Sequence, residues 1–163
     1  MKQLIFILLF FITPLSFCQN SLSDLLSKHN TKNIAYMSVQ ELAMPKTKAL
    51  ILDAREVNEF NTSHLKNAIY VGYNDFNIKT IKDLFPNKTS QIVVYCSIGI
   101  RSETIANKLK KEGYTNIYNL YGGIFEWKNH GYPVYNSEEK QTEEVHTFSK
   151  EWRKWLTKGK SVY

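Results

Sequence analysis

Two short runs of apolar residues constrain the fold more than any other feature of this sequence. They cover residues 49–53 and 91–95, and the second run is rich in β-branched side chains. A strand that is apolar along its whole length is buried on both faces, as the strands of a parallel sheet are. Parallel strands need crossover connections, which are usually helices. The two runs therefore predict an α/β domain with a central, mainly parallel sheet.

The segments around these two runs carry helical and further strand patterns. Residues 77–85 and 102–112 place apolar side chains at helical spacing, and the second stretch ends in basic residues before Gly113. The other predicted elements are a short helix opened by a Ser38–Glu41 capping box, strands at 67–71 and 116–120, and a helix at 124–129. Strands that alternate with helices predict a three-layer α/β domain over residues 34–134, preceded by an N-terminal segment at 19–33.

Residues 1–18 have the form of a secretory signal peptide. Lys2 precedes an unbroken apolar run at 4–12, and the small residues Ser16 and Cys18 have the spacing that a signal peptidase reads. The apolar run is far shorter than the ~20 residues of a spanning helix. We expect cleavage after Cys18 and export to the periplasm or cell envelope. In the alternative interpretation residues 15–18 form a lipobox, and the chain becomes a lipoprotein anchored through Cys18.

Cleavage after Cys18 leaves Cys96 as the one cysteine of the mature chain. A single cysteine in an exported protein cannot form an internal disulfide, so it is a buried inert thiol, an intermolecular partner or a reactive group. The two cysteines and four widely separated histidines of the sequence give no local metal-ligand spacing. We therefore expect neither a metal ion nor a cofactor.

The surroundings of Cys96 favour a reactive thiol. Residues 96–102 join the strand at 91–95 to the next helix, so they lie at the carboxyl end of a parallel strand, where α/β proteins bind ligands. Backbone N–H groups of such a loop converge on one point, and the helix N-terminus adds partial positive charge. Gly99 permits the turn, and Arg101 supplies a cation. Each feature favours the thiolate, so the pKa of Cys96 is expected below its ordinary value.

The sequence resembles the rhodanese-like sulfurtransferase family over residues 34–134. Four motifs carry the resemblance in the order that the family has them, at residues 50–55, 59–68, 94–102 and 120–134. Two departures are visible. Ser63 stands where the family usually has glycine, and Lys66-Asn67 stands where it often has Pro-Gly. These departures affect a local turn and leave the cysteine loop intact.

The resemblance implies a sulfurtransferase in which Cys96 is the catalytic nucleophile. Cys96 accepts a sulfane sulfur as a persulfide from thiosulfate or a persulfide donor and passes it to a thiophilic acceptor, cyanide or a thiol. The substrate-binding residues implied are Arg101, which favours an anionic donor, and the loop residues Ser97, Ile98, Gly99, Ile100 and Ser102. A sulfur-carrier or partner-binding module with little turnover is the alternative.

Phosphatase or arsenate reductase activity is the weaker interpretation. Four residues separate Cys96 from Arg101, whereas the related phosphatases have five, which widens the loop for a phosphoryl group. The apolar side chains of Ile98 and Ile100 also leave only Arg101 to attract a small dianion. A hydrophobic thiol or a persulfidated partner protein therefore competes with thiosulfate as the expected donor.

Four further charged or titratable residues lie upstream of the loop. We expect Asp53, Arg55, Glu59 and His64 to hold the scaffold together rather than to act in catalysis, because ion-pair networks of this kind are common in folded domains.

The last segment, residues 135–163, changes character. An acidic stretch precedes a basic one, which predicts a charged linker followed by a C-terminal amphipathic helix. The apolar face of that helix would contain Phe148, Trp152, Trp155 and Leu156. We expect this face to pack on its own domain, and in the alternative it docks on an anionic membrane or a protein partner. The formal net charge of +6 is too small and too dispersed to predict nucleic-acid binding.

Overall fold

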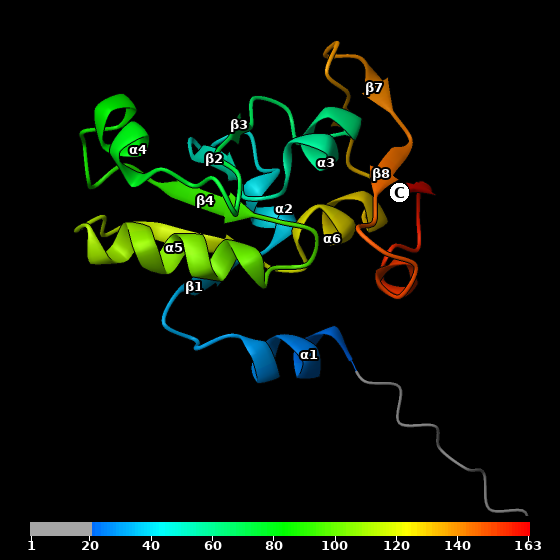
Figure 1. The fold of residues 1–163 in the computed structure, drawn as a ribbon, viewed down its shortest axis with the longest axis horizontal. Coiled ribbons are helices and arrows are strands. Elements are labelled where there is room, and N and C mark those ends of the chain that lie inside the picture. Colours follow the sequence, from blue (N-terminus) through cyan, green and yellow to red (C-terminus); the bar gives the residue numbers. More distant parts are fainter. Residues whose placement is uncertain (1–20) are drawn as a thin grey trace, which may run out of the picture.

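A five-stranded parallel sheet forms the centre of the protein (Figure 1). The computed structural model describes residues 21–163, so the predicted signal peptide and Cys18 lie outside the described residues. The strand order is β1-β5-β4-β2-β3, and every neighbouring pair runs parallel. The strands are β1 Ala35–Met37, β2 Leu50–Asp53, β3 Ile69–Tyr70, β4 Ile92–Tyr95 and β5 Ile117–Leu120. The predicted α/β fold with a parallel sheet is confirmed.

Strand β4 occupies the middle of the sheet, and all of its side chains are buried. It pairs with β2 from Leu50↔Ile92 to Asp53↔Tyr95, and with β5 from Ile92↔Ile117. The two apolar runs that dominate the sequence are therefore direct neighbours. Burial on both faces removes each aliphatic side chain from water, which stabilises the fold by about 1.5–3 kcal/mol per side chain.

Helices cover both faces of the sheet. The helices are α1 Leu22–His29, α2 Val39–Leu42, α3 Val57–Thr62, α4 Ile78–Leu84, α5 Arg101–Lys111 and α6 Gly123–Asn129. On one face, side chains of α4 and α5 such as Ile81 and Ile105 pack on Val94. On the other face, α2 and α6 contribute Leu42 and Phe125 to a second core cluster. In Figure 1, α1 lies outside the sheet on the side of the edge strand β1.

Most predicted elements match the structure closely. The predicted helix at 77–85 is α4, and the stretch at 102–112 is α5. Ser38 caps α2 by accepting a hydrogen bond from the Glu41 N–H. Helix α1 was not predicted, although Ser21 and Asp24 form a capping box at its start. Among residues 21–163, no helix has the length and apolar character needed to cross a membrane.

The prediction of a C-terminal amphipathic helix is wrong. Residues 134–142 form a short hairpin of β6 Val134–Tyr135 and β7 Gln141–Thr142. Strand β8 Glu144–His146 follows, then a single 3-10 turn at Trp152–Trp155 and strand β9 Lys160–Val162, which pairs parallel with β8. A continuous helix could not bring β9 back beside β8.

Hydrogen bonds to Asn129, at the end of α6, replace the helical ones in this C-terminal segment. The Asn129 side chain donates to the Trp155 carbonyl at 2.9 Å and accepts from the Thr157 N–H at 2.7 Å. The expectation that the apolar side chains pack on their own domain is met for Trp152, Trp155 and Leu156, which pack on the core. Phe148 is 59% exposed.

Candidate active site

Cys96 begins the loop that connects β4 to α5, at the carboxyl edge of the sheet. Its conformation depends on two glycines. Gly99 has φ +108°, a value that glycine adopts without strain. Gly123, the first residue of α6, lies so close to the loop that a Cβ would come within 2.2 Å of the Cys96 carbonyl oxygen. This close approach lets the Ile124 N–H donate to that carbonyl oxygen at 3.0 Å, so the first turn of α6 is hydrogen-bonded to the loop.

The Cys96 thiol is buried and surrounded by hydrogen-bond donors. Sγ accepts from the Gly99 N–H at 3.1 Å and lies 3.5 Å from the Ser102 hydroxyl. Burial raises the pKa of the thiol, but the nearby Arg101 cation, Ser102 and the Gly99 amide outweigh it and lower the pKa of Cys96 below its ordinary value. The depressed pKa predicted from the sequence is therefore confirmed.

Two asparagines hold the loop from outside. The Asn119 side chain on β5 donates to the Gly99 carbonyl at 2.8 Å, and its Oδ1 lies 2.7 Å from the Ser102 hydroxyl. Asn30, which caps the C-terminus of α1, also donates to the Gly99 carbonyl at 2.9 Å. The sequence analysis missed both residues, because no local pattern links them to Cys96. They hold the carbonyl of Gly99, the residue whose N–H contacts the sulfur.

Arg101 is engaged in an ion pair with Glu59 of α3. The two guanidinium nitrogens donate to the two carboxylate oxygens, each at 2.7 Å. Ser97 joins the pair, since its hydroxyl donates to Glu59 at 3.1 Å and accepts from Arg101 at 3.0 Å. Burial raises the pKa of Glu59, but Arg101 outweighs it and lowers that pKa below its ordinary value. Arg101 lines the site, but its charge is balanced by Glu59.

The remaining upstream charges lie in the scaffold, as predicted. Asp53 and Arg55 are fully buried and form an ion pair at 2.7 Å, and the Tyr95 hydroxyl also donates to Asp53. His64 stacks on the Phe60 ring with a centroid distance of 4.1 Å. Glu59 differs from the other three upstream residues, because it holds Arg101 in the loop. Among residues 21–163, no group of His, Cys, Asp and Glu side chains is arranged to hold a metal ion.

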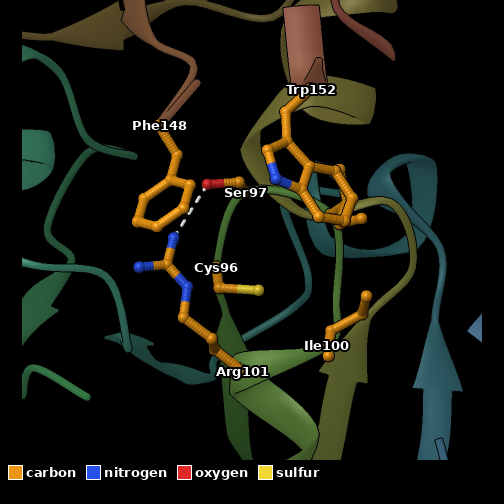
Figure 2. A pocket seen from close by; sticks show the side chains of 7 residues that line it. Cys96, Ser97, Ile100, Arg101, Phe148 and Trp152 are labelled. Atoms are coloured by element: carbon orange, nitrogen blue, oxygen red, sulfur yellow. Dashed lines mark hydrogen bonds between the residues drawn. The ribbon is translucent and has the colours of Figure 1, made fainter. Parts of the chain in front are cut away.

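A cavity of about 240 Å³ opens beside Cys96 (Figure 2). Five of its lining residues belong to the loop: Cys96, Ser97, Ile98, Ile100 and Arg101. Two more, Phe148 and Trp152, come from the C-terminal segment. Figure 2 shows the sulfur of Cys96 pointing to the space between Trp152 and Ile100. The lining is therefore largely apolar.

Four of the six predicted substrate-binding residues line this cavity: Ser97, Ile98, Ile100 and Arg101. The other two, Gly99 and Ser102, contact the sulfur instead. Phe148 and Trp152 were missed as site residues, because their spacing was interpreted as a helix face. Their signal in the sequence was the presence of large aromatic residues in a charged tail.

Comparison with known proteins adds three findings. The family model described as Rhodanese-like domain matches residues 38–130, more than half of the chain. A thiosulfate sulfurtransferase GlpE of Coxiella burnetii is 29% identical over 99 residues, which are 61% of this chain and 89% of that protein. A tRNA uridine(34) hydroxylase of Aster yellows witches'-broom phytoplasma is 37% identical over 107 residues, 59% of this chain. The chain thus matches only 33% of the length of that hydroxylase.

Solved structures show the same fold. The rhodanese-like domain from Anabaena sp. superposes with a TM-score of 0.58 and 22% identity, covering 66% of this chain and 83% of that domain. A thiosulfate sulfurtransferase from Pseudomonas aeruginosa superposes with a TM-score of 0.58 and 21% identity, covering 76% of this chain and 23% of the other. At these identities the likeness concerns the architecture.

Proposed function

Because the chain belongs to the rhodanese-like domain family, as its motifs predicted, we propose that it is a sulfurtransferase that carries a sulfane sulfur on Cys96. The observation that carries the proposal is the buried Cys96 thiol, whose donors and neighbouring Arg101 lower its pKa. The thiolate form of cysteine is the nucleophile that sulfur transfer needs, and a lowered pKa favours that form. The similarity to the Coxiella sulfurtransferase, which covers most of that protein, supports the same reaction.

The reaction proceeds in two displacements. The Cys96 thiolate attacks the outer sulfur of the donor, the donor's S–S bond breaks, and its electron pair leaves with sulfite when the donor is thiosulfate. The Cys96 persulfide that results keeps its negative charge near the Gly99 amide and Ser102 hydroxyl. A cyanide ion or a thiolate then attacks the outer sulfur of the persulfide and restores the Cys96 thiolate. Neither step requires a general base, because both nucleophiles react as anions.

The hydroxylase activity of the phytoplasma relative is not part of the proposal, because only about one third of that protein is matched. We propose in addition that residues 1–18 direct export to the periplasm or cell envelope, with lipidation of Cys18 as the alternative. The support is the sequence pattern of a short basic start, an apolar run and a small-residue cleavage site.

Intact-mass spectrometry tests the reaction. The purified mature protein is weighed alone, after thiosulfate or an organic persulfide, and again after cyanide. We expect a gain of one sulfur atom that maps to Cys96 and is removed by the acceptor, and no gain in Cys96→Ser. The mass before treatment also reports whether the chain starts at Gln19 or at a lipidated Cys18.

Two outcomes would contradict these proposals. A protein that takes up no sulfur from either donor is not a sulfurtransferase of this type. A Cys96→Ser variant that still transfers sulfur would remove Cys96 from the mechanism. Sulfur uptake without repeated transfer to cyanide would favour the sulfur-carrier alternative.

A further inference from the structure

The outer wall of the Cys96 cavity is built by a segment that the family match does not include. We call residues 144–162 the C-terminal strap, and the matched region ends at residue 130. The strap is fixed at both ends. Strands β8 and β9 pair with each other, Val145 is buried in the core, and Asn129 holds the residues after Trp155. Between these anchors, Phe148 and Trp152 line the cavity.

Phe148 combines an unfavourable backbone conformation with an exposed apolar side chain, and both features cost stability. Its φ of +63° lies in the left-handed region, which is unfavourable for a residue with a Cβ, and the residue is 59% exposed. The His146 ring nitrogen fixes its backbone by accepting from the Phe148 N–H at 3.0 Å. Backbone strain of this kind is concentrated at functional sites. Here it places an aromatic side chain in the lining of the cavity.

The strap also covers the one cation of the cavity lining. The Arg101 guanidinium lies 5.4 Å from the centroid of the Phe148 ring, and Glu59 occupies two of its nitrogens. The arginine and its counterion together carry no net charge. Thiosulfate, a dianion, would therefore be attracted to this pair less strongly than to an arginine without a counterion. An apolar group would instead contact Ile100 and Trp152, which lie on opposite sides of the sulfur in Figure 2.

We infer that the C-terminal strap makes the Cys96 site selective for sulfane sulfur donors that carry an apolar group, aromatic in the best case, over thiosulfate. The inference rests on the proposed sulfurtransferase function and specifies its donor. With an arylthiosulfonate, the Cys96 thiolate attacks the terminal sulfur, the S–S bond breaks, and the electron pair leaves with the arylsulfinate. One anion and one thiolate give one persulfide anion and one sulfinate, so charge and atoms balance.

A charge-matched pair of donors separates the apolar contact from electrostatics. Benzenethiosulfonate and methanethiosulfonate are both monoanions with the same reacting sulfur, and they differ in the group that the cavity would hold. Rates of Cys96 persulfide formation are measured by quenched-flow intact mass, with thiosulfate as a third donor. We expect benzenethiosulfonate to react about tenfold or more faster than methanethiosulfonate, because its ring is removed from water. Thiosulfate is expected to be the slowest.

Three variants assign the preference to the strap. Trp152→Ala and Trp152→Gln are expected to reduce the ratio of the two thiosulfonate rates to about threefold or less, since a large part of the apolar wall is lost. Trp155→Ala is the matched control, because Trp155 belongs to the same turn but does not line the cavity. It should retain the wild-type ratio. Melting temperatures identify a variant whose strap has detached.

The outcomes distinguish this inference from the function on which it rests. Equal rates with the two thiosulfonates in the wild type, or an unchanged ratio in both Trp152 variants, would overturn the selectivity and leave the sulfurtransferase proposal standing. Absence of persulfide on Cys96 with all three donors would refute the proposed function and this inference together.

Discussion

Replacing Glu59 with glutamine removes the counterion of Arg101 and keeps the shape of the side chain. The Glu59 carboxylate is buried and accepts from both terminal nitrogens of Arg101, from the Ser97 hydroxyl and from the Glu56 N–H. In Glu59→Gln the neutral amide can satisfy only part of this set. The guanidinium stays in place with an unbalanced charge next to the cavity, so stability and donor preference both change.

The loss of stability follows from the burial of the pair. Removing one partner of a fully buried ion pair costs about 3–5 kcal/mol. The Arg101 side chain is 19% exposed, and water reaches its charge, so we expect about 2 kcal/mol for Glu59→Gln. For a chain of this size the melting temperature falls by about 4–8 °C.

The pH dependence of this difference has a definite sign. The pKa of Glu59 is lowered in the folded protein, so the ion pair stabilises the fold above the ordinary glutamate pKa of 4.5. Its contribution is lost as the pH falls through the lowered pKa of the folded state. The gap in stability between the wild type and Glu59→Gln should therefore be full at pH 7 and shrink in acid.

The donor preference should move toward thiosulfate. Thiosulfate carries one more negative charge than methanethiosulfonate, and an unbalanced Arg101 attracts it. At about 5 Å and an effective dielectric constant of about 20, one unit charge contributes about 3 kcal/mol, and solvent and salt reduce this to about 1.4 kcal/mol. The ratio of the thiosulfate rate to the methanethiosulfonate rate should rise by about tenfold.

The assay combines thermal melting with the rate of persulfide formation from each donor. A variant that melts lower but keeps the wild-type donor ratio would show that Arg101 does not face the donor. An unchanged melting temperature would show that the Glu59–Arg101 pair does not stabilise the fold. Either result would refute the reasoning that Glu59 sets the charge of the site.

Two further variants test the loop itself. Ser102→Ala removes a hydroxyl that lowers the pKa of Cys96, so the pH profile of persulfide formation should shift to higher pH, and an unshifted profile would remove Ser102 from thiolate stabilisation. Gly123→Ala would force a Cβ within 2.2 Å of the Cys96 carbonyl oxygen and should destabilise the fold by about 2 kcal/mol or more in chemical denaturation. Gly131→Ala is its control, because Gly131 also has a positive φ but nothing lies within 4 Å of the added atom; equal losses would show that the backbone angle alone is responsible.

The sheet and the position of the nucleophile were predictable because their signals are local. A strand buried on both faces is apolar along its length, so β2 and β4 are visible as runs of residues. Cys96 follows β4 directly and precedes α5, so its place at the carboxyl edge of the sheet follows from chain order. Helix α5 is marked by its apolar periodicity and by Gly113.

The electrostatics of the site depended on contacts between residues far apart in the sequence. Glu59 and Arg101 are 42 positions apart, and the loop that Asn30 supports is 69 positions away from it. Nothing in the local pattern of α3 separates a scaffold carboxylate from the counterion of an active-site arginine. The sequence analysis therefore identified Arg101 as a cation of the loop but not its partner, whereas the fold pairs it with Glu59.

The C-terminal strap shows the same division most clearly. The spacing of Phe148, Trp152, Trp155 and Leu156 fits one face of a helix, and sequence periodicity alone cannot distinguish that helix from an irregular segment held by other contacts. The pairing of β8 with β9 and the hydrogen bonds of Asn129 decide between them, and both join residues that are well separated in the sequence. By itself the sequence determined the α/β sheet and placed the thiol at its edge, because an apolar strand and the residue that follows it can be recognised within a short stretch of sequence. Only the tertiary structure decided which distant side chains surround that thiol, because their positions depend on how the finished layers pack.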